Sequence, residues 1–214
     1  MAGHNYFAIE GAIGAGKSTL VQALAKRTNA RIIETPAEDN PFLENFYRDP
    51  KHYSFSTQVF FLLSRYRLLT ALFEMDLFHQ AAVSDFVFQR DEIYARLLLN
   101  DAELRLYRQV EEHLRKDIPA PHLVVFLQSP VEMLVRNLSR SGRTIEKKYL
   151  TENFLSALSR EYTQFFFNWD SCPLLVVDTG SVDIDNESNL SKLVSYILDT
   201  PIKGTQYYSA ATLF

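Results

Sequence analysis

The sequence predicts an α/β protein in which a five-stranded parallel sheet is flanked by helices. Two observations support this prediction. Short apolar runs alternate with helical segments five times along the chain, and the first run leads into a glycine-rich loop followed by a helix. Because 214 residues is the length of one ordinary domain, a single domain over 1–214 is expected.

The glycine-rich loop has the pattern of a phosphate-binding loop. Residues 11–18 spell G-x-x-x-x-G-K-S, after an apolar strand over 6–10 and before a helix over 18–28. Glycine lets the backbone point its N–H groups at a phosphate, and the helix N-terminus favours an anion. Lys17 is expected to neutralise phosphate charge and Ser18 to reach Mg²⁺. The expected nucleotide-binding residues are Gly11, Ala12, Ile13, Gly14, Ala15, Gly16, Lys17, Ser18 and Thr19.

Carboxylates end the next two predicted strands. The run 30–34 ends in Glu34, and the run 81–85 ends in Asp85. The carboxyl ends of parallel strands meet at one edge of a sheet, where ligands bind. Taken alone, Glu34 could equally be a capping or surface acid. Two acids beside one phosphate-binding loop nevertheless indicate a site.

Helices are expected over 40–47 and 54–73, from a start signature and from apolar residues on one face. On the second helix, Gln58 and Arg65 lie seven residues apart and share a face, so they could read the edge of a base. From spacing alone, a solvated polar stripe explains them better. Further helices are expected over 91–100 and 101–115, with Asp101 as a cap.

A strand is expected over 122–127 and a helix over 130–139, and the segment over 136–143 is rich in arginine. Arg136, Arg140 and Arg143 surround Ser141-Gly142 in an otherwise acidic chain. This composition predicts a short lid whose cations meet the oxygens of a phosphoryl group in transfer.

The last part of the chain completes the alternation. A helix over 149–167, a strand over 174–178 and a helix over 190–198 are expected. The apolar and aromatic tail over 201–214 is expected to pack on the body of the protein or on a second subunit.

Composition excludes several classes of partner. A net charge of −4 argues against binding to nucleic acid, and no apolar stretch reaches the roughly 18 residues of a membrane span. The lone Cys172 cannot form an internal disulfide, which fits a reducing compartment. The start of the chain has no basic region followed by an apolar run. A soluble cytoplasmic protein is therefore expected.

Several of these motifs occur together in one known family. From about residue 6 to residue 198 the chain resembles the deoxynucleoside kinase family, most nearly its bacterial deoxyadenosine and deoxyguanosine kinases. The stretches that carry the resemblance are the phosphate-binding loop, 34–36, 40–50, 55–58, 63–65, 84–85 and 136–143. The resemblance implies a P-loop kinase fold with an arginine-rich lid. It also implies an enzyme that uses ATP and Mg²⁺ to phosphorylate the 5′-hydroxyl of a small-molecule deoxynucleoside, and a homodimer.

The resemblance also implies roles for individual residues near the reacting groups. Glu34 matches the general base that accepts the proton of the 5′-hydroxyl. Lys17, Arg140 and Arg143 would assist phosphoryl transfer, and Arg136 and Arg140 would hold ATP. Asp85 matches an acid that helps Ser18 to hold Mg²⁺ close to the substrate.

For the nucleoside, the resemblance implies contacts to both base and sugar. Gln58 would hydrogen-bond the base, Arg65 with Asp91 would read its edge, and Tyr94 would stack on it. Tyr47 and Glu146 would bind the 3′-hydroxyl. An ionised Asp91 only accepts hydrogen bonds, so it favours a base with an amino group. Deoxyadenosine is expected first, with deoxyguanosine or deoxycytidine next.

Two departures from the family pattern leave alternatives open. Phe86 stands where the family has an arginine, and Arg90 lies nearby in the sequence. The lid reads Arg-x3-Arg-x2-Arg instead of Arg-x3-Arg-x-Arg, so either a residue is inserted near Ser141 or Asn137 and Ser141 take the family's positions. A nucleotide-binding structural or regulatory subunit and a nucleoside monophosphate kinase are the alternative functions.

Overall fold

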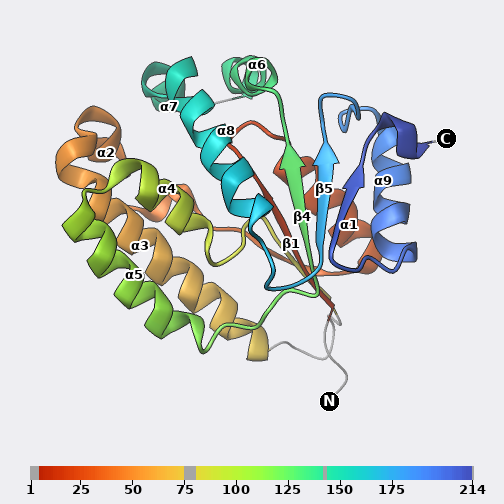
Figure 1. Cartoon of the computed structure of the whole chain (residues 1–214), viewed down its shortest axis with the longest axis horizontal. Coiled ribbons are helices and arrows are strands. Elements are labelled where there is room, and N and C mark those ends of the chain that lie inside the picture. The colour runs from red at the N-terminus through yellow and green to blue at the C-terminus, as the bar shows by residue number, and fades with distance from the viewer. Residues whose placement is uncertain (1–4, 75–80, 142–143, 214) are drawn as a thin grey trace.

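A single parallel sheet forms the centre of the computed structural model, which describes residues 5–74, 81–141 and 144–213 (Figure 1). The strand order is β2-β3-β1-β4-β5-β6, and every pair is parallel. The strands are β1 (Asn5–Gly11), β2 (Arg31–Ile33), β3 (Ala81–Ser84), β4 (Leu123–Gln128), β5 (Leu174–Asp178) and β6 (Thr205–Tyr208). The predicted α/β class with a parallel sheet is confirmed, but the expected number of strands was one too low.

The sixth strand, β6, comes from the aromatic tail, which adds to the sheet edge beside β5. Tyr208 is buried on the body, whereas Tyr207 is 68% exposed. Central strands of a parallel sheet have continuous apolar sequences because both of their faces are covered. This short edge strand has no such apolar sequence. The sequence Thr-Gln-Tyr-Tyr therefore carried no strand signal of that kind.

Helices cover both faces of the sheet. In Figure 1, α1 lies behind the strands and next to α9, while α8 crosses in front of them. A group made of α3, α4 and α5 lies to one side. The helices are α1 (Lys17–Thr28), α2 (Leu43–Arg48), α3 (Pro50–Thr70), α4 (Arg90–Leu98), α5 (Asp101–Arg115), α6 (Val131–Ser141), α7 (Thr144–Tyr149), α8 (Glu152–Phe167) and α9 (Glu187–Asp199). No helix within these described ranges is long and apolar enough to cross a membrane.

Most helix ends differ by a few residues from the sequence prediction, and two of the differences come from capping residues. Asn100, not Asp101, caps α5: its side chain accepts hydrogen bonds from the N–H groups of Ala102 and Glu103, and Glu103 completes a capping box. The helix predicted over 149–167 begins later, because Thr151 caps α8 through the N–H of Phe154. The preceding residues form the separate helix α7.

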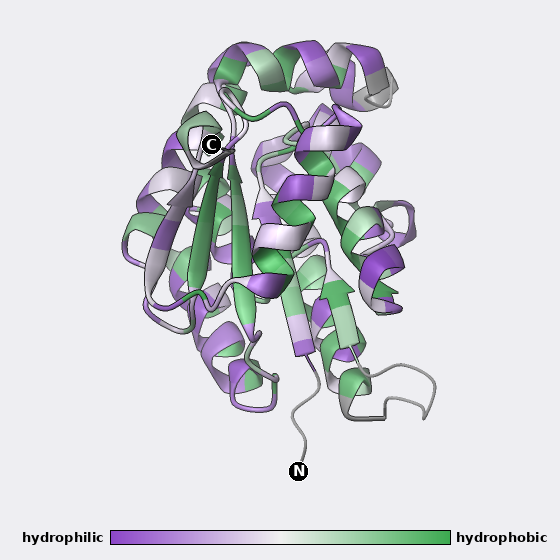
Figure 2. Ribbon diagram, turned by 90° about the vertical axis from the view of Figure 1, so that its right-hand side faces the viewer, coloured by the Kyte–Doolittle hydropathy of each residue, from purple (hydrophilic) through white to green (hydrophobic). Residues whose placement is uncertain are grey.

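The core gathers on the inner strands, which appear as the green centre of Figure 2. On one face, an aromatic stack joins α8 to β4: the ring centroids of Phe126 and Phe166 are 4.4 Å apart, and Tyr162 stacks on Phe126 at 6.1 Å. This packing brings the hydroxyl of Tyr162 to the end of β1. Since the strands are parallel, the loops that follow β1, β2, β3 and β4 all leave from the same edge of the sheet.

Candidate active site

The phosphate-binding loop leaves the carboxyl end of β1 and enters α1. Two of its glycines have a left-handed backbone, with φ of 86° at Gly14 and 90° at Gly16. A Cβ at Gly14 would lie 3.0 Å from the carbonyl oxygen of Leu134, so the loop and α6 approach each other closely there. Lys17 folds over the loop and donates hydrogen bonds to the carbonyls of Gly11 at 2.8 Å and Ala12 at 3.2 Å. Burial, assisted by the charge of Arg90, lowers the pKa of Lys17 to about 8.

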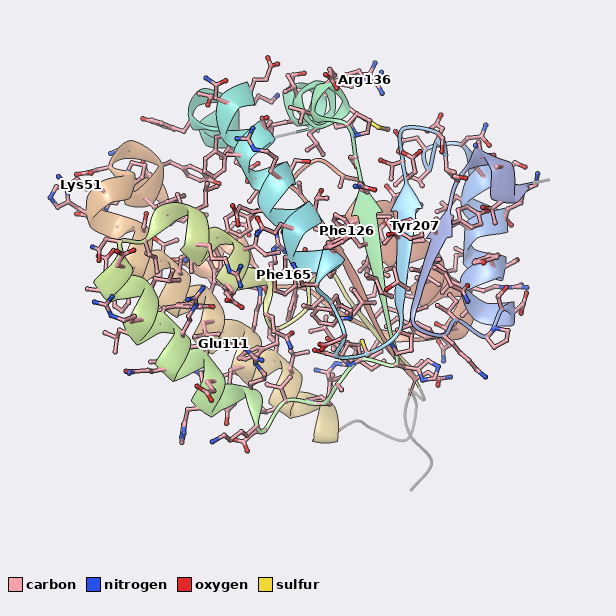
Figure 3. All side chains as sticks on the ribbon, viewed as in Figure 1. Lys51, Glu111, Phe126, Arg136, Phe165 and Tyr207 are labelled. Carbon is pink, nitrogen blue, oxygen red and sulfur yellow. The ribbon has the colours of Figure 1, made fainter. Side chains whose placement is uncertain are left out.

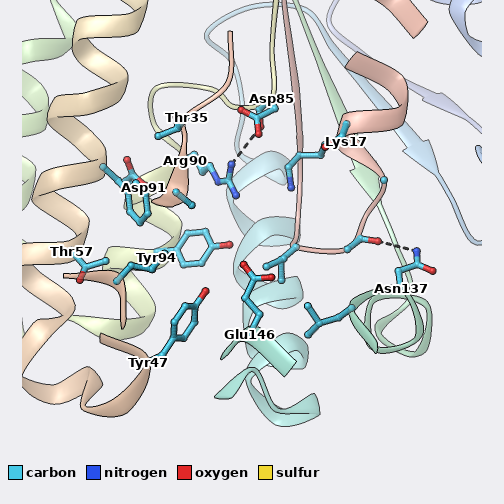
Figure 4. Close-up of a pocket in the computed structure, with 18 of the residues that line it drawn as sticks. Lys17, Thr35, Tyr47, Thr57, Asp85, Arg90, Asp91, Tyr94, Asn137 and Glu146 are labelled. Atoms are coloured by element: carbon cyan, nitrogen blue, oxygen red, sulfur yellow. Dashed lines mark hydrogen bonds between the residues drawn. The ribbon is translucent and has the colours of Figure 1, made fainter. Parts of the chain in front are cut away.

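A cavity of about 720 Å³ extends from this loop toward α3 and α4 (Figure 4). At the loop end it is lined by Ile13, Gly14, Gly16, Lys17, Ser18 and Thr19. At the far end it is lined by Tyr47, Gln58, Arg65, Asp91, Tyr94 and Glu146. Asp85 and Arg140 also line it. The structure therefore brings most of the residues expected from the sequence around one space.

Polar atoms without a partner concentrate in this cavity. Among the described residues, the buried side-chain atoms that make no hydrogen bond are Thr35 Oγ1, Thr57 Oγ1, Arg65 Nε, Asp85 Oδ1, Arg90 Nε, Asp91 Oδ2 and the Tyr107 hydroxyl. All of these residues except Tyr107 line the cavity. Because an unsatisfied buried polar group costs about 1–3 kcal/mol, this set indicates a site built for a polar ligand.

A buried ion pair forms the far wall. Arg65 on α3 donates to Asp91 on α4, and neither side chain is more than 6% exposed. The rings of Phe61 and Phe86 lie on the Arg65 guanidinium, each with its centroid 5.2 Å from the central carbon. Phe86 therefore packs at the base of this pair and supplies no polar group to the phosphate end.

Glu10 and Arg90 form a second cluster beside the loop. Glu10 is fully buried, and its carboxylate accepts hydrogen bonds from the N–H groups of Gly11 and Val87, each at 3.0 Å, and from the Tyr162 hydroxyl at 3.2 Å. The Nε atom of Arg90 lies 3.7 Å from this carboxylate. Sequence reasoning did not single out Glu10; the available signal was a charged residue that ends an apolar strand directly before the loop glycine.

Some residues expected at the site lie outside the cavity. Gly11, Ala12 and Ala15 belong to the phosphate-binding loop, but they are buried and do not line the cavity. Glu34 is exposed at the end of β2, while its neighbour Thr35 lines the cavity. Burial and the nearby Asp85 carboxylate raise the pKa of Glu34 above its ordinary value.

The arginine-rich segment meets the loop through Asn137, which one of the two interpretations of the lid spacing placed in the family's position. Asn137 on α6 donates a hydrogen bond from its amide to the carbonyl of Gly14 at 2.9 Å. Arg140, three residues later on the same face, lines the cavity, whereas Arg136 is exposed and points outward in Figure 3. Successive helical residues project about 100° apart, so Arg136 and Asn137 cannot both face the loop. Arg143 lies outside the residues whose side chains are described.

Fold and site together define a P-loop phosphotransferase, with a phosphate site at one end of the cavity and a site of buried polar groups at the other. The chain belongs to the deoxynucleoside kinase family, whose family model, "Deoxynucleoside kinase", matches residues 7–202. The family resemblance seen in the sequence is thus confirmed. The chain is an enzyme of the class that phosphorylates deoxynucleosides with ATP.

Individual relatives carry related names. The chain is 29% identical over 198 residues to the deoxyguanosine kinase of Bacillus subtilis, covering 90% of this chain and 95% of the relative. It is 30% identical over 167 residues to the deoxyadenosine kinase of Dictyostelium discoideum, covering 75% of this chain and 66% of the relative. The structure of a deoxyadenosine kinase from M. mycoides matches with a TM-score of 0.80 at 22% identity, over 91% of this chain and 99% of that one, which shows a shared fold.

Proposed function

We propose that this kinase transfers the γ-phosphoryl group of ATP to the 5′-hydroxyl of deoxyadenosine, with deoxyguanosine and deoxycytidine as further substrates. The observation that supports this proposal most strongly is the concentration of unpaired buried polar atoms in a cavity that begins at the phosphate-binding loop. Such a cavity accommodates a triphosphate at one end and an uncharged nucleoside at the other.

The far wall supplies the chemistry for a base with an amino group. Asp91 has one carboxylate oxygen bonded to Arg65 and one buried oxygen without a partner. That oxygen accepts from an exocyclic amino group, and the Nε of Arg65 is a free donor for a ring nitrogen beside it. Thymine presents a carbonyl at this position, which the carboxylate repels. Gln58, 3% exposed, adds an amide, and Tyr94 offers an aromatic face for stacking.

Tyr47 and Glu146 support binding of the sugar. Both are buried, both line the cavity, and they come from α2 and α7, which pack together. The stacked rings of Tyr47 and Tyr149, with centroids 6.2 Å apart, hold the two helices in register. A phenol and a carboxylate suit the 3′-hydroxyl of an uncharged sugar, and they supply no cation for the phosphate of a nucleoside monophosphate.

The reaction forms a bond from the 5′-oxygen to the γ-phosphorus and breaks the bond from that phosphorus to the β–γ bridging oxygen, so that ADP leaves. The proton of the hydroxyl passes to a carboxylate, and we assign this role to Glu34. Its raised pKa favours it as an acceptor, and it lies next to cavity-lining Thr35. Lys17 and Arg140 balance the charge of the phosphoryl oxygens, since this reaction depends mainly on alignment and electrostatics.

The residues at the loop fit a magnesium ion. Asp85 has a buried carboxylate oxygen without a partner, and the Ser18 hydroxyl lines the same part of the cavity. One carboxylate, one hydroxyl and phosphate oxygens are the kind of ligand set that Mg²⁺ takes in nucleotide sites. Asp85 and Ser18 would hold the ion, which would neutralise phosphate charge during transfer.

The wider setting follows from the family resemblance and from composition. We place the enzyme in deoxynucleoside salvage in the cytoplasm, as a homodimer packed through helices. The single cysteine supports a reducing compartment. Light scattering of the purified chain would test the dimer.

A phosphotransfer assay tests the reaction and the substrate together. Radiolabelled Mg·ATP would be offered with deoxyadenosine, deoxyguanosine, deoxycytidine, thymidine or deoxyadenosine monophosphate to the wild type and to Glu34→Gln, with the exposed Glu38→Gln as a matched control. Turnover of deoxyadenosine that is lost only in Glu34→Gln supports the proposal. Faster turnover of thymidine would overturn the nucleoside assignment. Preference for the monophosphate would favour a nucleoside monophosphate kinase, and ATP binding without any transfer would favour a regulatory subunit.

A further inference from the structure

We infer that Arg90 supplies the cation that contacts the transferred phosphoryl group, at a position different from that of the arginine replaced by Phe86. This inference rests on the proposed function. The Phe86 side chain is fully buried on Arg65, so a cation is missing from the phosphate end of the cavity unless another residue provides it.

Arg90 is placed where that cation is needed. As the first residue of α4, it follows the loop that leaves β3 at Asp85. Figure 4 shows its side chain pointing from α4 into the space between Asp85, Lys17 and Tyr94. Its guanidinium carbon lies 5.8 Å from the centre of the Tyr94 ring, on the nucleoside side. Arg90 therefore lies between the phosphate-binding loop and the proposed stacking residue, where a phosphoryl group would pass from ATP to the sugar.

The hydrogen-bonding capacity of Arg90 is largely unused within the described part of the chain. A guanidinium has five N–H donors. The Arg90 side chain makes one long hydrogen bond, from Nη1 to the carbonyl of Asp85 at 3.4 Å, and its buried Nε has no hydrogen-bond partner. The carboxylate of Glu10 lies 3.7 Å away, beyond hydrogen-bond distance, and accepts its hydrogen bonds from the two backbone N–H groups and the tyrosine hydroxyl described above. Arg90 thus has free donors and a cavity to direct them into.

Electrostatics points to an anion in the same space. Lys17 and Arg90 are close enough for the charge of Arg90 to contribute to the low pKa of Lys17. An anion placed between the two groups would favour the charged form of both. A planar guanidinium also matches the geometry of phosphoryl oxygens through paired hydrogen bonds.

The alternative is a bracing role, in which Arg90 only holds the carbonyl of Asp85 and the carboxylate of Glu10 in place. A brace would affect ground-state binding and stability, whereas a cation on the transferred group acts on kcat. The two roles are therefore separable by kinetics.

The experiment compares Arg90→Gln and Arg90→Lys with Arg96→Gln. Arg96 is a matched control because it lies on the same helix and pairs with Glu92 at the surface. For each protein, we would measure kcat with ATP and deoxyadenosine, the Kd of ADP and of deoxyadenosine by calorimetry, and the thermal midpoint. Each kinetic measurement would be repeated with a low concentration of guanidinium ion added.

We expect kcat of Arg90→Gln to fall about 10²- to 10³-fold, the loss typical of one transition-state donor. Both Kd values should stay within about threefold of the wild-type values. Added guanidinium should restore part of the kcat of Arg90→Gln and should leave the kcat of the wild type and of Arg96→Gln unchanged. A kcat within about threefold of the wild type would overturn the inference. So would a loss of kcat that guanidinium does not rescue and that is matched by weaker binding of both ligands.

If Arg90→Gln does not fold, Arg90→Lys decides the question, since it keeps the charge and loses the fork of donors. A fall in its kcat with unchanged Kd values supports the inference, whereas weaker binding of both ligands with an unchanged kcat indicates a bracing role and contradicts it. An inactive wild type would instead contradict the proposed function, so the two failures are distinguishable.

Discussion

The Oε2 atom of Glu10 accepts a hydrogen bond from the backbone N–H of Val87 at 3.0 Å, which ties the end of β1 to the loop after β3. The other carboxylate oxygen bonds the N–H of Gly11 and the hydroxyl of Tyr162 on α8. One buried side chain thus connects the phosphate-binding loop, the loop that carries Asp85 and the helix layer.

Replacement of this carboxylate should destabilise the protein. In Glu10→Gln, an amide N–H₂ faces a backbone donor, so we expect the free energy of unfolding to fall by about 1–3 kcal/mol. Urea denaturation measures this change. Glu112→Gln, at an exposed site on α5, should change stability by less than about 0.5 kcal/mol. Equal stability of the two variants would contradict the connecting role of Glu10.

Nucleotide binding should weaken as pH rises above about 8, because Lys17 loses its proton there in the free protein. A bound phosphate favours the charged lysine, so binding at pH 8.5 should take up a proton, and affinity should fall by up to about tenfold per pH unit. Calorimetry in two buffers of different ionisation enthalpy measures the proton uptake. The arginine in Lys17→Arg stays charged at this pH, so this variant should bind nucleotide without proton uptake. Proton uptake that persists in the variant would have to come from another group.

The lowered pKa of Lys17 should also make the stability of the folded protein depend on pH. The folded-state pKa of Lys17, about 8, lies below its ordinary value of 10.5, so the unfolded chain holds more protons between these values. The cost of burying the charged lysine is present below pH 8 and is relieved as pH rises from about 8 to 10.5. The contribution of Lys17 to stability should therefore increase over this window, as measured by comparison of wild type and Lys17→Met.

Asp91→Asn should reduce the preference for deoxyadenosine. The asparagine turns a carboxylate acceptor into a group that also donates, so kcat/KM for deoxyadenosine should fall at least about 10²-fold and the discrimination against thymidine should narrow. Competition assays with both nucleosides measure the ratio. The adjacent Glu92→Gln, whose carboxylate bonds Arg96, should leave the ratio unchanged. An unchanged ratio in Asp91→Asn would show that the base is read elsewhere.

Two buried tyrosines should respond in opposite ways to loss of their hydroxyls. Burial raises the pKa of both Tyr107 and Tyr162, but only Tyr162 has a partner, the Glu10 carboxylate. Tyr162→Phe should lower the free energy of unfolding by about 1 kcal/mol, whereas Tyr107→Phe should leave it unchanged or raise it by up to about 1 kcal/mol. Chemical denaturation of both variants checks this. A destabilised Tyr107→Phe would indicate a hydrogen bond, such as one to water, at that hydroxyl.

The sequence alone determined the features that are local in the chain. The spacing of Gly11, Gly16 and Lys17 specified the phosphate-binding loop, because strand, turn and helix N-terminus are consecutive there. The central strands were visible because both of their faces are buried, which leaves continuous apolar runs such as residues 123–127. The edge strand β6 has no such run, so it was missed.

Only the tertiary structure decided which side chains meet in the cavity. Arg90 and Lys17 are 73 positions apart in the chain, and Asn137 faces Gly14 from another helix while its neighbour Arg136 does not. Thr35, rather than Glu34, lines the cavity. Periodicity reports which face of a helix or strand is buried, but the direction of a side chain toward a ligand depends on how α4, α6 and β2 pack against β1. That packing is set by contacts between segments distant in the sequence.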